Sequence, residues 1–194
     1  MIKSALSYVL CVAMLAAAQQ AGNAPDEPVF IQGKKFVFTV KAPSGWVLDA
    51  KRAKQQNVKA WFRPERNPSD TKTYMYAYGV DTDGTAASYP KFIEKDQQTW
   101  KKKYPGLESK EVTLDISGAI REACVYRMSG MSDRFKIEVV YARAEKATIV
   151  LVFSAESKGY YNHYGEQFDA FLATLDYLGD NPEKILNEQG AEGE

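Results

Sequence analysis

The sequence predicts an α+β fold: a mostly antiparallel sheet of six to seven strands with helices packed on its faces, as in an α/β/α sandwich. Three observations predict this fold. Several segments of strand length carry apolar residues that alternate or run continuously. Most of these segments follow one another with only short turns between them, as antiparallel strands do. Two further segments carry apolar residues at helical spacing, and such stripes must be buried against a sheet or another helix.

The composition is that of a globular domain. The 194 residues include 25 Lys and Arg and 25 Asp and Glu, so the formal net charge is zero, and 45% of the residues are hydrophobic. These values exclude a collagen, a disulfide-rich scaffold and a protein with many membrane spans. Because binding to nucleic acid usually requires an excess of positive charge, we expect no nucleic-acid partner.

Residues 1–24 are predicted to be a signal peptide. Lys3 gives a positive start, and an uncharged, mostly apolar run follows it as far as Ala18. Small residues allow cleavage after Ala18 or after Ala24. The run is shorter than the ~20 apolar residues of a membrane-spanning helix, so we expect a periplasmic or secreted protein without a transmembrane span after processing. An uncleaved anchor and lipid attachment at Cys11 are the alternatives.

The mature chain is predicted to form one domain. A single globular domain covers residues 29–178, and the polar, acidic residues 179–194 are expected to form a flexible tail. After processing, Cys124 is the only cysteine, so no intramolecular disulfide is expected. We interpret Cys124 as a small buried apolar group, with a reactive thiol or an intermolecular bridge as the alternatives.

Three strands are expected before the first helix. They cover residues 35–41, 57–63 and 71–81, and Pro43-Ser44-Gly45 forces a turn after the first of them. The third strand is the most regular, because tyrosines alternate along it with small or apolar residues.

A helix is expected to follow these strands. Ser88 can cap its N-terminus, and Pro90 lies in its first turn, where a missing N–H costs little. Apolar residues recur at helical spacing as far as Tyr104, and the cations of Lys101–Lys103 suit the negative end of the helix dipole. Pro105 and Gly106 then end the helix.

Four strands and a second helix complete the domain. The strands are expected near residues 112–116, 119–128, 134–143 and 148–155, with the last two joined as a hairpin. The last strand is apolar almost throughout, which is typical of a central strand. The helix is expected over residues 159–177, and its apolar stripe is predicted to be core. This stripe consists of Tyr161, Tyr164, Phe168, Phe171, Leu172 and Leu175.

Three of these features together resemble a known family. They are a strand that leads into Pro43-Ser44-Gly45-Trp46, an apolar strand that ends in Phe153-Ser154-Ala155, and the aromatic terminal helix with Tyr160 and Tyr161. On these features, residues 30–178 resemble the PsbP/DcrB-like superfamily. The resemblance implies that the chain binds protein partners. Members of the superfamily share no catalytic residues, so the resemblance assigns no catalytic position.

The motifs for catalysis and for metal or cofactor binding are weak. His163 is the only histidine, so a nucleophilic triad or dyad would have to use it, and no G-x-S-x-G sequence surrounds a serine. There is no phosphate-binding loop and no cluster of zinc ligands. We therefore predict no catalytic residue, no metal and no cofactor. A hydrolase that uses His163 or paired carboxylates remains an alternative. The carboxylates considered are Glu94, Asp96, Asp115, Glu122 and Glu138.

The aromatic residues supply the candidate site. Tyr74, Tyr76 and Tyr78 share one face of a predicted strand, and Arg63 and Arg66 lie among the basic residues just before it. Tyrosine offers a large contact area at low entropic cost. We therefore predict an exported, non-enzymatic binding protein of the cell envelope that docks a protein or peptide partner through this aromatic and basic surface. A carrier of a lipid or an aromatic compound is the alternative, and the tyrosines could instead pack under a helix.

Overall fold

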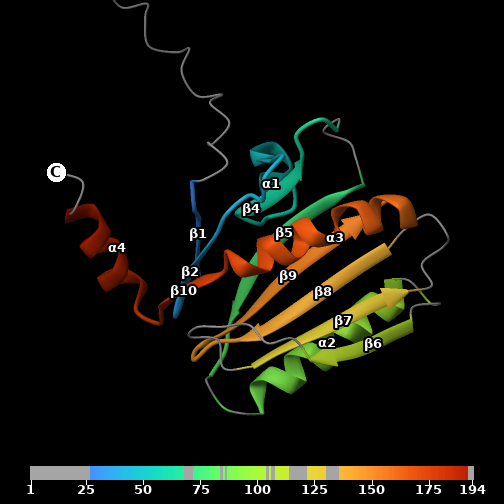
Figure 1. The fold of residues 1–194 in the computed structure, drawn as a ribbon. Coiled ribbons are helices and arrows are strands. Elements are labelled where there is room, and N and C mark those ends of the chain that lie inside the picture. Colours follow the sequence, from blue (N-terminus) through green and yellow to red (C-terminus); the bar gives the residue numbers. More distant parts are fainter. Residues whose placement is uncertain are drawn as a thin grey trace, which may run out of the picture.

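The computed structural model describes residues 27–67, 72–83, 85, 87–103, 105, 108–113, 122–129 and 136–191. Its largest element is a seven-stranded antiparallel sheet with the strand order β3-β4-β5-β9-β8-β7-β6. Helix α3 (Lys158–Ala173) lies on one face of this sheet and helix α2 (Ser88–Lys103) on the other (Figure 1). The predicted α+β sandwich is therefore confirmed. The strands are β3 (Trp46–Leu48), β4 (Ala60–Pro64), β5 (Tyr74–Asp81), β6 (Glu108–Thr113), β7 (Glu122–Ser129), β8 (Lys136–Arg143) and β9 (Ala147–Ala155).

A second, three-stranded sheet packs beside the first. It consists of β1 (Val29–Gln32), β2 (Val37–Val40) and β10 (Asp176–Gly179) in the order β1-β2-β10, with antiparallel pairing throughout. Only β2 was predicted. The first two residues of β10 were expected to end the terminal helix, but the backbone there pairs with β2 instead, which places Tyr177 opposite Phe38.

A glycine on β5 brings the two sheets together. The ring of Phe36 lies directly over Gly79, where a Cβ atom would come within 2.4 Å of the ring. The end of β5 is also joined to the turn between β1 and β2, because the Asp81 carboxylate accepts the backbone N–H groups of Lys34 at 3.2 Å and Lys35 at 2.8 Å. The small sheet therefore docks on β5 by ring packing and by hydrogen bonds.

Two clusters of buried side chains fill the sandwich. The first lies between the large sheet, the small sheet and α3, and in it the rings of Phe153 on β9 and Phe168 on α3 are 5.4 Å apart. The second lies beneath α2 and includes Tyr89 and Ile93 of that helix. Every residue of β9 is buried, as expected for a strand covered on both faces. The apolar stripe predicted for the terminal helix lies in the first cluster or packs against it.

The short helix α1 (Ala50–Gln55) was not predicted. Its six residues make fewer than two turns, so they carry no recognisable apolar stripe. It begins at Asp49, whose carboxylate accepts the backbone N–H of Arg52 at 2.9 Å and so caps the helix. The strand expected at residues 57–63 accordingly begins only at Ala60.

The C-terminal segment also differs from the expected flexible tail. Helix α4 (Pro182–Ala191) forms there and contacts β10. Asn181 caps it by accepting the backbone N–H of Lys184 at 3.2 Å, and Glu183 in the first turn suits the positive end of the helix dipole.

Some predictions lie outside the described residues. These are the signal peptide at residues 1–24, residues 71, 114–116, 119–121 and 134–135 of four expected strands, Tyr104 and Gly106 at the end of the first expected helix, and residues 192–194 of the expected tail. Among the described residues, no helix combines the length and the apolar character that crossing a membrane requires.

Candidate functional site

An aromatic row runs across β4 and β5 on the sheet face that carries α2. It consists of Trp61 on β4 and Tyr74, Tyr76 and Tyr78 on β5, and all four side chains are half-buried. The ring centroid of Trp61 lies 4.3 Å from that of Tyr74 and 4.9 Å from that of Tyr76, and both ring pairs are stacked. Tyr76 and Tyr78 are stacked at 6.1 Å. The three predicted tyrosines therefore lie together, and β4 adds a tryptophan to them.

Stacking fixes the rings of the aromatic row before any partner binds. Each ring contacts at least one other ring of the row, and Tyr76 contacts all three others. A side chain already held in one rotamer loses little conformational entropy on binding, which otherwise costs ~0.5–1.5 kcal/mol per side chain. The row is thus a preorganised apolar surface with tyrosine hydroxyl groups along it.

Helix α2 covers only part of the aromatic row. Tyr76 and Tyr78 pack against the buried cluster beneath α2, and among the described residues Trp61 and Tyr74 are not part of that packing. Burial and, secondly, the negative charge of Asp96 raise the pKa of Tyr78. The Tyr76 and Tyr78 end of the row therefore packs under a helix, which was the alternative to a docking surface. The Trp61 and Tyr74 end lies outside that packing.

A half-buried carboxylate anchors α2 to the sheet. Asp96 Oδ2 accepts hydrogen bonds from the Tyr141 hydroxyl at 2.5 Å and from Trp100 Nε1 at 3.2 Å. The hydroxyl of Tyr89, at the start of α2, donates to the main-chain oxygen of Tyr141 at 2.8 Å. These bonds fix how much of the aromatic row the helix covers.

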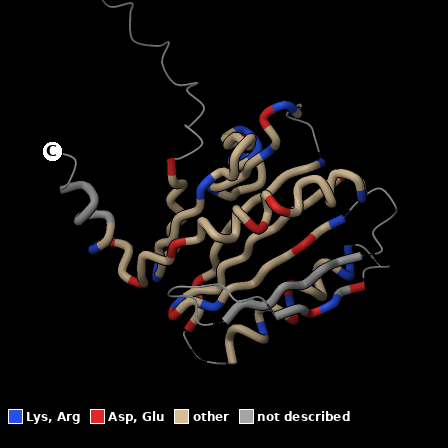
Figure 2. The backbone as a smooth tube through the Cα atoms, in the orientation of Figure 1, with Lys and Arg blue, Asp and Glu red and all other residues tan. Residues whose placement is uncertain are grey.

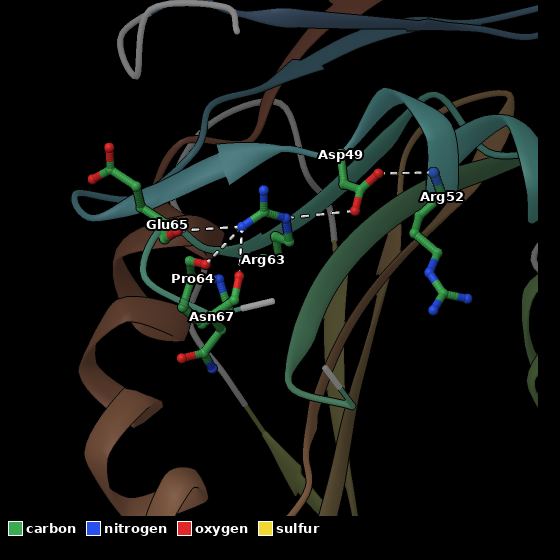
Figure 3. A network of polar contacts seen from close by, with 6 residues as sticks. All are labelled: Asp49, Arg52, Arg63, Pro64, Glu65 and Asn67. Atoms are coloured by element: carbon green, nitrogen blue, oxygen red, sulfur yellow. Dashed lines mark hydrogen bonds and ion pairs between the residues drawn. The ribbon is translucent and has the colours of Figure 1, made fainter. Parts of the chain in front are cut away.

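Arg63, a predicted partner-binding residue, makes internal contacts through its guanidinium (Figure 3). Its Nη1 donates to the main-chain oxygens of Pro64 at 3.2 Å, Glu65 at 3.3 Å and Asn67 at 2.7 Å. Its Nε forms an ion pair with Asp49 Oδ2 at 3.6 Å, a separation too long for a hydrogen bond. Since Asp49 also caps α1, Arg63 joins the turn after β4 to the start of that helix.

Arg66 is exposed in the turn after β4 and lies toward α3. Burial, followed by Tyr160, raises the pKa of Tyr164 on α3, and the positive charge of Arg66 opposes that rise. The ring of Tyr164 packs edge-on against Trp46 at 5.2 Å, on the core side of the sheet. The structure therefore brings the three predicted tyrosines together but places Arg66 near the other face.

A second candidate surface is a groove of about 310 Å³ beside α1. It is lined by α1, by the end of β3 and by the loop that leads into β4. Lys and Arg residues gather on α1 and around it (Figure 2). Asn57 has φ 55°, a left-handed conformation that asparagine tolerates, and it turns the chain from α1 toward β4. The lining residues include Leu48, Ala53, Lys54, Asn57, Val58 and Lys59.

The described residues of the hydrolase alternative are spread over α2, β7, β8 and α3. His163 is exposed on α3, and among the described residues no carboxylate or nucleophile hydrogen-bonds to it. Glu138 accepts a hydrogen bond from Tyr161 on the face that carries α3, whereas Asp96 lies on the face that carries α2. Cys124 lies in β7, and Asp115 is outside the described residues. Within the described part of the chain, no three His, Cys, Asp or Glu residues are grouped so as to hold a metal ion.

Two features of the candidate surfaces were missed from the sequence. Trp61 precedes the buried Phe62 on β4, and successive side chains of a strand point to opposite faces. The sequence could therefore have predicted that Trp61 lies on the face opposite to Phe62. Its neighbours could not, because they depend on the register of β4 against β5, which pairs Trp61 with Tyr76. The groove depends on α1, which carries no helical signal in the sequence.

Comparisons with known proteins identify the fold. No family model and no curated protein matches the chain. Among solved structures, it is similar to cyanobacterial PsbP from Synechocystis sp. PCC 6803, with a TM-score of 0.54 and 13% sequence identity. The match covers 84% of this chain and 98% of that one. The chain therefore has a PsbP-like α+β fold, as the sequence resemblance implied.

Proposed function

We propose that this chain is an exported, non-enzymatic binding protein of the cell envelope that docks a protein or peptide partner. The docking surface is the aromatic row, and its centre is the Trp61 and Tyr74 end. The observation that carries the proposal is that four stacked aromatic side chains stay half-buried, with only one end packed beneath α2.

Three physical arguments support a protein partner. Tryptophan and tyrosine are over-represented among the residues that dominate the free energy of protein–protein binding. The mutual stacking of the aromatic row keeps its rings in place at little further entropic cost. The row also combines apolar rings with hydroxyl groups, a mixture typical of binding surfaces that remain soluble when unoccupied.

Export is part of the proposal and has its own test. If residues 1–24 act as a signal peptide, the protein recovered from cells should begin at Gln19 or Pro25 and should fractionate outside the cytoplasm. Intact-mass measurement of the recovered protein reports its N-terminus. A chain that keeps Met1 and remains in the cytoplasm would contradict export.

Docking is tested by capturing the partner from envelope extracts and then measuring its affinity for purified variants. Trp61→Ala and Tyr74→Ala should each weaken binding about tenfold or more, which corresponds to a loss of about 1.4 kcal/mol. Tyr160→Ala is the matched control, because Tyr160 is a half-buried, stacked tyrosine on α3. It should leave the affinity unchanged.

The folded state of each variant is checked by urea unfolding. If Trp61→Ala and Tyr74→Ala are folded and bind the partner as the wild type does, the aromatic row is not the docking surface. An equal loss of affinity in Tyr160→Ala would also contradict the assignment, since that residue lies on the opposite side of the sheet.

A further inference from the structure

We propose that the groove beside α1 binds an acidic peptide segment that carries an aliphatic anchor residue. The inference deepens the proposed function, because it assigns a chemistry to the partner. It rests on that function only for the expectation that the occupant is a peptide, since none of the groove residues belongs to the aromatic row.

The floor of the groove is apolar and preformed. Leu48, Ala53 and Val58 supply aliphatic surface, and Ala53 is only 4% exposed. The loop that forms one wall is held in place, because the N–H of Val58 donates to Ala53 O at 2.9 Å and the N–H of Asn57 donates to Lys54 O at 3.2 Å. A volume of about 310 Å³ lies at the low end of the ~300–1,000 Å³ typical of ligand pockets, so the groove suits one or two side chains of a larger molecule.

The charge around the groove is positive. Lys54 and Lys59 line it, Lys51 lies on the same helix, and all three are exposed. Among the described residues, no carboxylate forms an ion pair with any of them. The neighbouring acid Asp49 does not neutralise them, because its two oxygens are used by the backbone N–H of Arg52 and by Arg63. Charge complementarity therefore favours an anionic occupant.

The position of the groove favours a peptide over an acyl chain. The groove is open to solvent, whereas a carrier must enclose most of the apolar surface of its ligand. Leu48, which lines the groove, ends β3, and β3 is an edge strand of the large sheet. An edge strand can offer main-chain hydrogen bonds to an extended peptide, and an acyl chain has no use for them.

The test is a titration of the ¹⁵N-labelled protein with short peptides, monitored by amide chemical shifts. The probe is acetyl-EELEE-amide, compared with acetyl-EESEE-amide, which lacks the aliphatic anchor, and acetyl-KKLKK-amide, which reverses the charge. We expect the first peptide to shift the amides of Leu48 and residues 53–59, and the other two to shift them at least about tenfold less at equal concentration.

Variants separate specific binding from general attraction between charges. Lys54→Glu combined with Lys59→Glu should weaken binding of acetyl-EELEE-amide about tenfold or more. Lys158→Glu is the matched control: Lys158 is an exposed lysine in the first turn of α3, where glutamate suits the helix dipole. It should bind the peptide as the wild type does.

Three outcomes would overturn the proposal. They are no shift of the groove amides, equal shifts with acetyl-EESEE-amide, and an equal loss of binding in Lys158→Glu. Shifts with hexanoate but not with the peptide would instead assign the groove to a small carboxylate. None of these outcomes bears on docking through the aromatic row, because that is read from the Trp61→Ala and Tyr74→Ala variants.

Discussion

At the scale of single residues, Arg63 shows how a charged side chain on a strand can be structural. Its guanidinium reaches three main-chain oxygens of the turn after β4 and the Asp49 carboxylate that caps α1. This structural role cannot be predicted from the sequence. It depends on the conformation of the turn, which places the main-chain oxygens of Pro64, Glu65 and Asn67 around Arg63 Nη1. In the sequence, Arg63 is simply one of several neighbouring basic residues.

Replacing Arg63 with lysine tests this structural role. Arg63→Lys keeps the charge, but an ammonium on a flexible stem cannot replace a planar guanidinium that meets Asp49 and the turn together. We expect the free energy of unfolding to fall by about 1–3 kcal/mol, measured by urea denaturation at pH 7. The exposed Arg66, in the same turn, is the control, and Arg66→Lys should change stability by less than about 0.5 kcal/mol. Equal effects of the two changes would show that Arg63 has no special structural role.

Because of Tyr78, the free energy of unfolding should depend on pH in the alkaline range. Burial, followed by Asp96, raises its pKa above the ordinary value of 10.0, so the folded protein holds this proton more tightly than the unfolded chain does. The resulting stabilisation is complete below pH 10 and is lost as the pH rises from there toward the folded-state pKa.

We expect Tyr78→Phe to lose less stability than the wild type between pH 9 and pH 11, as measured by urea unfolding at each pH. The difference between the two proteins at pH 7, where the Tyr78 hydroxyl keeps its proton in the folded and unfolded states, is the reference. If Tyr78→Phe and the wild type lose stability in parallel, the hydroxyl of Tyr78 does not titrate as its burial requires.

At the scale of elements, the sequence predicted those whose pattern repeats over two turns or several alternations. Helix α3, β5 and β8 were predicted because their pattern is periodic over 8 to 16 residues, and β9 because its nine residues are apolar almost throughout. β1, β3, α1 and β10 were missed, and each spans six residues or fewer, which leaves little room for a pattern. Short length is not the whole reason, because β2 and β4 are as short and were predicted, whereas the ten-residue α4 was missed in a polar segment. The formation of the missed elements depends on tertiary contacts, such as the pairing of β10 with β2, which a single sequence does not reveal.

The docking of the small sheet on β5 can be tested at Gly79. Gly79→Ala would place a methyl group within 2.4 Å of the Phe36 ring, so the two sheets must move apart. Overpacking of this kind costs about 1–3 kcal/mol. Gly165→Ala on α3 meets no atom within 4 Å and should instead stabilise the protein by about 0.5–1 kcal/mol, because alanine favours a helix. Chemical denaturation of both variants gives the two values, and a neutral Gly79→Ala would contradict the packing described here.

At the scale of the whole molecule, the two faces of the sheet differ in how completely they are covered. On the α3 face, the small sheet and α3 bury one large cluster, and on the other face α2 leaves Trp61 and Tyr74 outside its contact. The sandwich and the shared face of Tyr74, Tyr76 and Tyr78 could be predicted from periodicity. The addition of Trp61, the separation of Arg66 and the groove beside α1 could not, because strand register and short elements determine them.

The most direct test of docking through the aromatic row is photo-cross-linking in intact cells. Photoreactive benzoylphenylalanine replaces Tyr74 in one variant and Tyr160 in a second variant. Each variant then cross-links to the proteins that contact its own face of the sheet. We predict that position 74 yields one defined cross-linked partner, that Trp61→Ala removes this product, and that position 160 does not yield it. The account is contradicted if position 74 yields no product, or if both positions yield the same one.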